Sequence, residues 1–188
     1  ARILAPLGET VVSGHAVALN IASIVFMLPL AIGLAASTRV GNLLGEKRYI
    51  DARYSSKISL SLCFIGALFN MTLLITLGDK LISLYTKDLL VYSVASHLII
   101  FAAIFQIPDG IGMGSLGALR GYKDTFMTMV FIIIAYWVFA IPFGYYLTYY
   151  GINQPMGESG MWIRMILGLT IFASLISRRL IKISGQYL

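Results

Sequence analysis

The residue of this sequence best suited to ion chemistry is Asp109, an acid in the middle of a long apolar run. It follows Pro108 directly, and glycines stand at every second position after it, at Gly110, Gly112 and Gly114. An ionised carboxylate is expensive in hydrocarbon, so such acids usually face a bundle interior, an opposite charge or a wet cavity. Asp109 is the only acid inside an apolar run rather than at its edge. We interpret it as a binding site for a cation or a proton.

The alternative role for Asp109 is a structural acid paired with a base on a neighbouring helix. No Lys or Arg lies near the middle of an apolar run, which favours the ion site over the ion pair. On a helix, residues three or four positions apart share a face. Phe105, Gln106 and Gly112 are spaced in this way from Asp109, and we expect them to line its surroundings.

Two further polar residues, His15 and Asn20, lie in the first long apolar run. We include both as pocket-lining candidates. A histidine with its ordinary pKa near 6.5 is suited to carry a proton. The commoner role at such a position is a helix cap or an interfacial hydrogen bond, and we favour that role for His15. His97 and Cys63 stand apart from it, so the sequence predicts no metal site other than Na+ at Asp109.

The glycines of the Asp109 run match the dinucleotide-binding pattern at Gly112, Gly114 and Gly117. That pattern requires a preceding strand and a following acid, and the sequence supplies neither. The glycines instead predict close helix packing through small residues. The sequence also lacks a nucleophile elbow, a zinc-protease motif and paired catalytic carboxylates, so we do not expect an enzyme or a cofactor.

The composition predicts an integral membrane protein. Of 188 residues, 59% are hydrophobic and 12% charged, and the mean hydropathy is +0.86. The net charge is +6, but the basic residues gather at the ends of apolar runs, which indicates anchoring at the membrane surface. We therefore expect membrane lipid as a partner and no nucleic acid.

Five apolar runs are each long enough for the roughly 20 residues of a membrane-spanning helix. Because the runs are continuous rather than alternating, we predict an all-α polytopic bundle in one domain, residues 1–188. Residues 1–8 resemble the end of a sixth helix that began earlier. The five full spans are expected at about 14–38, 55–77, 89–119, 125–150 and 157–181.

The basic residues predict the orientation of these spans. Ten of the 14 Lys and Arg fall on the side reached after the first, third and fifth spans, which the positive-inside rule places in the cytoplasm together with the C-terminus. These ten are Arg39, Lys47, Arg48, Arg53, Lys57, Arg120, Lys123, Arg178, Arg179 and Lys182.

Three prolines, Pro29, Pro108 and Pro142, lie well inside predicted spans and are expected to kink them. Each proline frees the carbonyl four residues earlier from its helix hydrogen bond. Unpaired carbonyls are costly in lipid, so we expect these helix faces to look inward. Pro142 is equally well explained by the general frequency of proline in membrane helices.

Three stretches together resemble one family. The run HAVALNIASIVFMLPLAIGLAASTRVGNLLGE, from His15, resembles the eighth transmembrane segment of bacterial multidrug and toxic compound extrusion (MATE) transporters. FQIPDGIGMGSLGALRGYKD, from Phe105, resembles their tenth segment, and PMGESGMWIRMILGL, from Pro155, their twelfth.

This resemblance implies that the chain is the C-terminal six-helix lobe of a twelve-helix antiporter of the bacterial inner membrane. With an N-terminal lobe that this chain lacks, it would exchange Na+ or H+, its coupling ion, for cationic drugs by alternating access. The family's tenth-helix acid falls on Asp109, and its usual glutamate companion would precede Ala1.

The sequence also departs from the family pattern. Phe105 stands where the family often has tyrosine, Ala16 and Gly112 where it has glutamine, and Arg164 where it has a small residue. These departures leave the ion and the substrate range open. An alternative within the same superfamily is a flippase for lipid-linked oligosaccharides. Flippases tend to have basic cavities, whereas the mid-span charge here is acidic.

Overall fold

The computed structural model describes residues 8–149 and 157–186, and all regular structure in these ranges is helical. This confirms the predicted all-α class. The elements are α1 (Glu9–Gly45), α2 (Tyr49–Tyr85), α3 (Leu89–Gly121), α4 (Thr125–Ile133), the π-helical segment η2 (Ile134–Ala140), α5 (Ile141–Tyr149) and α6 (Gly157–Gln186).

Five stretches of helix in the described residues are long and apolar enough to cross a membrane, and α4, η2 and α5 together form the fourth. Large apolar side chains are exposed along these helices, with Ile24 61%, Phe69 60% and Trp137 70% exposed. Such a surface suits a lipid environment. The chain is therefore a multi-pass membrane protein, as its composition predicts. The expected partial helix at 1–8 lies outside the described residues except for Gly8, which precedes α1.

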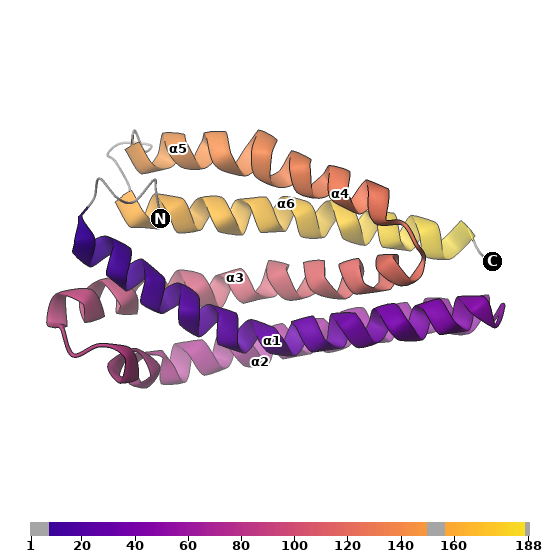
Figure 1. The fold of residues 1–188 in the computed structure, drawn as a ribbon, viewed down its shortest axis with the longest axis horizontal. Coiled ribbons are helices and arrows are strands. Elements are labelled where there is room, and N and C mark those ends of the chain that lie inside the picture. Colours follow the sequence, from indigo (N-terminus) through magenta and orange to yellow (C-terminus); the bar gives the residue numbers. More distant parts are fainter. Residues whose placement is uncertain (1–7, 150–156, 187–188) are drawn as a thin grey trace.

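The long α3 helix lies at the centre of the arrangement. It packs against α1 and α2 on one side and against α6 on the other, whereas α4, η2 and α5 pack mainly against α6 (Figure 1). The turn between α1 and α2, the turn between α3 and α4, and the C-terminus all lie at one end of the bundle (Figure 1).

Both turns at this end have the same backbone design. Lys47 and Lys123 adopt left-handed conformations, with φ of 59° and 61°. In the first turn the Arg48 N–H donates to the Leu43 carbonyl at 2.9 Å, and the second turn repeats this long-range bond. Such bonds satisfy the free carbonyls at a helix C-terminus and let the next helix reverse direction within a few residues.

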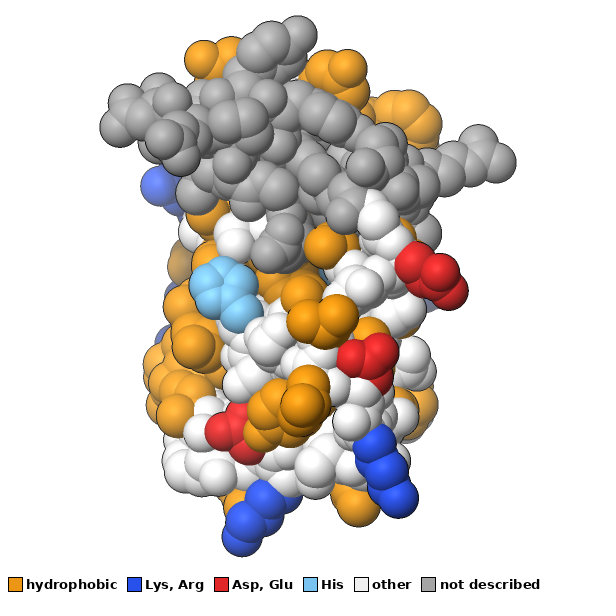
Figure 2. All heavy atoms as spheres, turned by 90° about the vertical axis from the view of Figure 1, so that its left-hand side faces the viewer, with side chains coloured by type: hydrophobic (Ala, Val, Ile, Leu, Met, Phe, Trp, Pro, Cys, Tyr) orange, Lys and Arg blue, Asp and Glu red, His pale blue; other side chains and the backbone are white. Residues whose placement is uncertain are grey.

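The opposite end of the bundle has mixed charges. Figure 2 shows acidic and basic side chains on this face together with a histidine. Asp88 caps α3 here, because its Oδ1 accepts a hydrogen bond from the Leu90 N–H at 2.8 Å.

Glycines allow α3 to approach its neighbours closely. A Cβ added at Gly110 would meet the Cβ of Ala67 at 2.7 Å, and one at Gly121 would meet the Cβ of Val40 at 2.7 Å. Gly117 lies directly against the backbone of Gly33. This confirms that these glycines serve helix packing.

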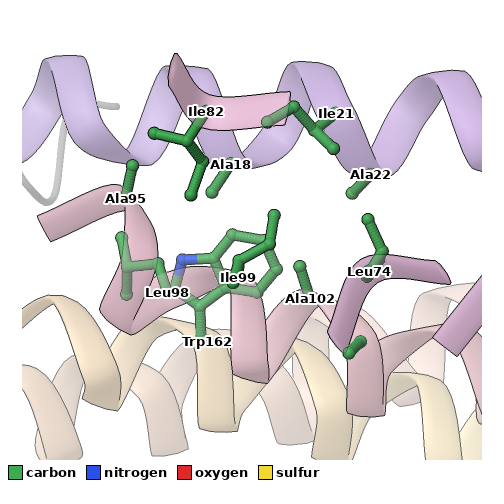
Figure 3. Packing of buried hydrophobic residues seen from close by; sticks show 11 residues of the cluster. Ala18, Ile21, Ala22, Leu74, Ile82, Ala95, Leu98, Ile99, Ala102 and Trp162 are labelled. Atoms are coloured by element: carbon green, nitrogen blue, oxygen red, sulfur yellow. The ribbon is translucent and has the colours of Figure 1, made fainter. Parts of the chain in front are cut away.

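Two clusters of buried side chains fill the bundle. One joins α1, α2, α3 and α6 around Trp162, which is fully buried between Leu98, Ile99 and Ala102 (Figure 3). The other lies nearer the end with the two matching turns and includes Val40, Leu119 and Tyr122.

The three prolines differ in where they lie. Pro29 is buried within α1 and Pro108 within α3. Pro142 is exposed on α5, so the expectation of an inward-facing surface fails for it within this lobe. The π-helical segment η2 lies directly before α5. Its hydrogen bonds reach one residue further back than in an α-helix, as in the bond from the Ile141 N–H to the Tyr136 carbonyl.

Candidate functional site

Asp109 lies on α3, the central helix of the bundle, and its side chain is half-buried. Among the residues that the structure describes, no Lys, Arg or His pairs with this carboxylate and none donates a hydrogen bond to it. This arrangement leaves the carboxylate oxygens available for a proton or a cation. The neighbouring Pro108 removes one helix hydrogen bond, to the carbonyl of Ile104, immediately before the acid.

Glycines and a proline fix the direction in which Asp109 points. The next residue, Gly110, packs against α2, and its added Cβ would lie 2.9 Å from the Cys63 carbonyl. Gly112, three residues on, faces α6, where the ring of Phe172 would meet its Cβ at 3.3 Å. A side chain at Gly110 would push α2 and α3 apart, whereas one at Gly112 would require a small shift of the Phe172 ring. Close contact on both sides therefore holds the α3 backbone in place around the acid.

Gln106 takes part in a buried polar network rather than facing Asp109. It is fully buried, and its Oε1 accepts a hydrogen bond from Asn70 Nδ2 at 3.4 Å. Asn70 Nδ2 also donates to the Val25 carbonyl at 2.7 Å. That carbonyl is the one that Pro29 leaves without its helix partner, so Asn70 of α2 satisfies it.

The amide nitrogen of Gln106 remains without a partner. Among the described residues, nothing accepts a hydrogen bond from Nε2 of Gln106, although the atom is buried. Buried amide groups of this kind are usually bonded to protein or to water. The network of Asn70, Gln106 and Val25 thus has one free donor close to the central helix.

Phe105 and His15 meet through Trp162 of α6. The ring centroids of Phe105 and Trp162 are 6.1 Å apart, and the angle between the ring planes is 77°. For His15 and Trp162 the centroid distance is 5.7 Å and the interplanar angle is 74°. Edge-to-face contacts of this type stabilise aromatic pairs. His15 is buried, and its Nδ1 has no hydrogen-bond partner among the described residues. His15 therefore lies in the core rather than at a helix cap.

Asn20 lies apart from these residues. It is exposed on α1, and its Nδ2 donates to the Ala16 carbonyl of the same helix at 2.9 Å. The structure thus brings together Phe105 and His15 through Trp162. Gln106 and Gly112 flank Asp109 on α3 but face other helices.

Sequence reasoning missed one residue near the acid, Tyr136 of η2. Tyr136 lies within electrostatic reach of the Asp109 carboxylate, and its ring lies beside Gly168 of α6. π-helical segments often occur at functional sites because they redirect side chains locally. The available signal was Pro142, six residues further along the chain, which disturbs the preceding turns.

The acid stands apart from other potential metal ligands. In residues 8–149 and 157–186, no three His, Cys, Asp or Glu side chains lie close enough to hold a metal ion together. Sodium accepts carbonyl and hydroxyl oxygens besides carboxylates, as hard cations do.

Comparison with known proteins agrees with this architecture. The MatE family model matches residues 2–146. The chain is 44% identical over 181 residues to the multidrug resistance protein NorM of Vibrio vulnificus, covering 96% of this chain and 40% of that protein. It is 40% identical over 188 residues to the multidrug resistance protein MdtK of Proteus mirabilis, covering 99% of this chain and 41% of that protein.

A third relative is more distant in sequence. The multidrug resistance protein PmpM of Pseudomonas aeruginosa is 34% identical over 189 residues, which cover 100% of this chain and 40% of PmpM. The chain therefore spans about 40% of the length of these relatives. The family match covers most of the chain and includes the whole of α3. On these grounds the chain belongs to the MATE family of membrane transporters.

Proposed function

We propose that this chain is the C-terminal lobe of an antiporter that exports cationic drugs and other xenobiotics in exchange for Na+ or H+. Asp109 carries the coupling ion. The observation that carries this proposal is a half-buried carboxylate on the central helix without a basic partner in the described chain. The names of the three relatives as multidrug resistance proteins support the export of drugs.

The mechanism follows from the charge of Asp109. Binding of a proton or Na+ neutralises a carboxylate that is costly to keep ionised in an apolar bundle. A bound ion therefore favours the packing in which Asp109 is dry, and release favours the one in which it is wet. An ion can shift the equilibrium between two states only by the difference in its affinity for them. The inward gradient of that ion then drives the drug outward.

The proposed transporter also needs parts outside this chain. A second lobe of similar architecture would complete the drug pathway, as repeated lobes do in other secondary transporters. The two basic turns and the C-terminus lie at the same end of the bundle (Figure 1), which supports a cytoplasmic position for that end. We place the protein in the bacterial inner membrane.

The test is ethidium efflux from cells that express the two-lobe transporter, with Na+ and pH gradients imposed separately. Efflux that follows one gradient identifies the coupling ion. Asp109→Asn keeps the size of the side chain and removes its charge, so we expect it to abolish gradient-driven efflux. The amount of folded protein in the membrane should stay unchanged.

Asp51→Asn is the matched control. Asp51 is an exposed acid in the first turn of α2 and is far from the apolar core of the bundle. The control should retain efflux. Normal efflux in Asp109→Asn would defeat the assignment of the ion site. Absence of efflux under both gradients in the native protein would instead favour a flippase for lipid-linked oligosaccharides.

A further inference from the structure

A groove lies between α6 on one side and η2 with the start of α5 on the other, and Asp109 is not among the residues that line it. Its volume is about 360 Å³, and it is open along one side. Its walls are apolar except for one arginine, and the residues that matter are Val138, Phe139, Phe143, Arg164, Leu167 and Ile171. Figure 1 shows the two helices side by side along this stretch.

The shape of the groove follows from uneven spacing of the two helices. At Gly168, α6 approaches η2 closely, because an added Cβ would meet the Cβ of Ala140 at 2.8 Å. On either side of this contact, large side chains splay outward, and Phe139 and Phe143 are each 49% exposed. The groove therefore has a closed floor and apolar walls.

Arg164 is the unusual member of this lining. Its Nε is buried, and among the side chains that the structure describes none accepts a hydrogen bond from it. No described carboxylate forms an ion pair with it. A buried guanidinium N–H without an acceptor is costly, and it fits phosphate or carboxylate oxygens well. An anionic group beside Arg164 would remove this cost.

The order of residues along α6 matches the order of groups in a lipid. Arg164 is near the start of α6 at Gly157, where the helix approaches the membrane surface, and Leu167 and Ile171 follow deeper in the helix. The distance from Arg164 to Ile171 is roughly 10 Å at the rise of an α-helix. On the antiparallel side, Phe143 of α5 is correspondingly near the surface and Val138 of η2 is deeper.

We propose that this groove binds an anionic phospholipid, whose phosphate accepts hydrogen bonds from Arg164 and whose acyl chain lies along Leu167 and Ile171. The bilayer supplies such a ligand at the required depth and in the required orientation. This site is separate from the ion site at Asp109 and does not depend on it. A bound lipid fills the gap beside the close contact of Gly168 with Ala140.

The test uses the purified two-lobe transporter in detergent, to which phosphatidylglycerol or phosphatidylcholine of the same chains is added. Native mass spectrometry counts the lipids retained. We expect the native protein to retain phosphatidylglycerol in preference, and Arg164→Ala to lower this preference roughly tenfold, as expected for loss of a charge-assisted hydrogen bond. Arg178→Ala, which removes an exposed charge from the same helix, is the control and should keep the preference.

A second variant tests the apolar part of the site without touching the charge. Leu167 is 39% exposed, so Leu167→Trp can fill the groove without disturbing the core. We expect it to reduce retention of both lipids at this site. The proposal is overturned if phosphatidylglycerol binding is unchanged in Arg164→Ala, or is lost equally in Arg178→Ala. Should Arg164→Ala fail to fold, unchanged lipid retention in Leu167→Trp overturns it.

A different result would identify another occupant. If the native protein shows no lipid preference and Arg164→Ala destabilises it equally in both lipids, Arg164 pairs with an acid in another part of the transporter. That result also overturns the lipid proposal, because the groove would then be covered by protein.

Discussion

The bundle contains two regions that pack by different means. In the first, formed by α1, α2 and α3, backbones approach closely, and a Cβ added at Gly14 would meet Val94 at 2.6 Å. In the second, formed by α4, η2, α5 and α6, one close contact at Gly168 is accompanied by splayed side chains and an open groove. The first region also has a groove, of about 310 Å³ between α1 and α2, but its helices make several close backbone contacts, whereas the second region contains the π-helical segment.

Asp109 lies where these two regions meet. Gly110 of α3 packs closely against α2 on one side of Asp109. Gly112 of α3 faces Phe172 of α6 on the other side. A binding group is most effective when a rigid element holds it. We call the first region, α1 to α3, the rigid region, and the second, α4 to α6 with η2, the looser region. The rigid region positions the acid, while the looser region contains the elements able to repack when an ion binds or leaves.

The largest expected effect comes from breaking the rigid region. Gly117→Leu places a side chain against the backbone of Gly33, so α1 and α3 must separate. We expect the free energy of unfolding to fall by more than about 3 kcal/mol, which is the upper end for overpacking, so little folded protein should remain. Size-exclusion chromatography of the detergent-solubilised protein measures this.

Gly185→Leu is the control for this change, because an added Cβ at Gly185 meets nothing within 4 Å. It should elute as the native protein does. A sharp, native-like peak for Gly117→Leu would mean that the close approach of α1 and α3 is not required for folding.

The next effect concerns the polar network inside the rigid region. Asn70→Leu keeps the volume of the side chain but leaves the Val25 carbonyl and Gln106 Oε1 without their donor. We expect a loss of about 2 kcal/mol in stability, because buried polar groups then stay unpaired. Thermal unfolding followed by loss of the monomeric peak measures it.

Asn20→Leu serves as the matched change. Asn20 is exposed and bonds only its own helix, so its loss should alter stability by less than about 0.5 kcal/mol. Equal melting temperatures for the two variants would show that the carbonyl freed by Pro29 does not need Asn70.

The rigid region was largely predictable from the sequence, because its determinants are local. Continuous apolar runs gave the helices, and the small residues around Asp109 predicted close packing. The carbonyl of Val25 was expected to need a partner once Pro29 was identified inside a span. That Asn70 supplies the hydrogen bond depends on how α1 and α2 are rotated, which a single sequence does not reveal.

The looser region and the surroundings of Asp109 were harder to predict. A π-helical segment has no distinct sequence pattern, so Tyr136 was missed. Helical spacing suggested that Gln106 shares a face with Asp109, but spacing of three residues leaves a wide angle, and Gln106 bonds Asn70 instead. Asn20, which we expected to line the pocket, is exposed. The sequence did not show this, because an apolar helix in a membrane gives few clues to which of its faces points inward.

A smaller effect is expected where the two regions meet. Tyr136→Phe removes one hydroxyl near Asp109 and keeps the ring beside Gly168. If the proposed ion site is correct and the Tyr136 hydroxyl contacts the bound ion, the concentration of coupling ion that gives half-maximal efflux should rise roughly fivefold, as expected for loss of a contact of about 1 kcal/mol. The maximal rate at saturating ion should be retained.

Tyr54→Phe is the control for this change, since Tyr54 is 66% exposed on α2. It should leave the ion dependence unaltered. An unchanged ion dependence in Tyr136→Phe would place η2 outside the ion site and would weaken the role given to the looser region.

The smallest effect concerns the ion pair that ties α6 to the turn after α3. Arg179 Nε donates to Asp124 Oδ2 at 2.6 Å, and the two side chains are 23% and 13% exposed. Water and salt screen such a pair, so a double-mutant cycle with Arg179→Ala and Asp124→Asn should give a coupling of about 0.5 kcal/mol. Thermal unfolding at low and high salt measures it.

The pair of Arg48 and Asp51 provides the contrast, because it has a single hydrogen bond of 2.8 Å and side chains that are 58% and 51% exposed. The same cycle there should give no measurable coupling. If the coupling at Arg179 and Asp124 also vanishes, this ion pair does not hold the second region to the first. Apolar contacts such as Gly112 with Phe172, and the hydrogen bond between the Ser115 and Ser177 hydroxyls at 3.0 Å, then join α3 to α6. If instead the coupling is large and insensitive to salt, the turn after α3 holds α6 rigidly at this end. Repacking on ion binding must then occur toward the other end of α6, near Trp162 and beside the groove at Arg164.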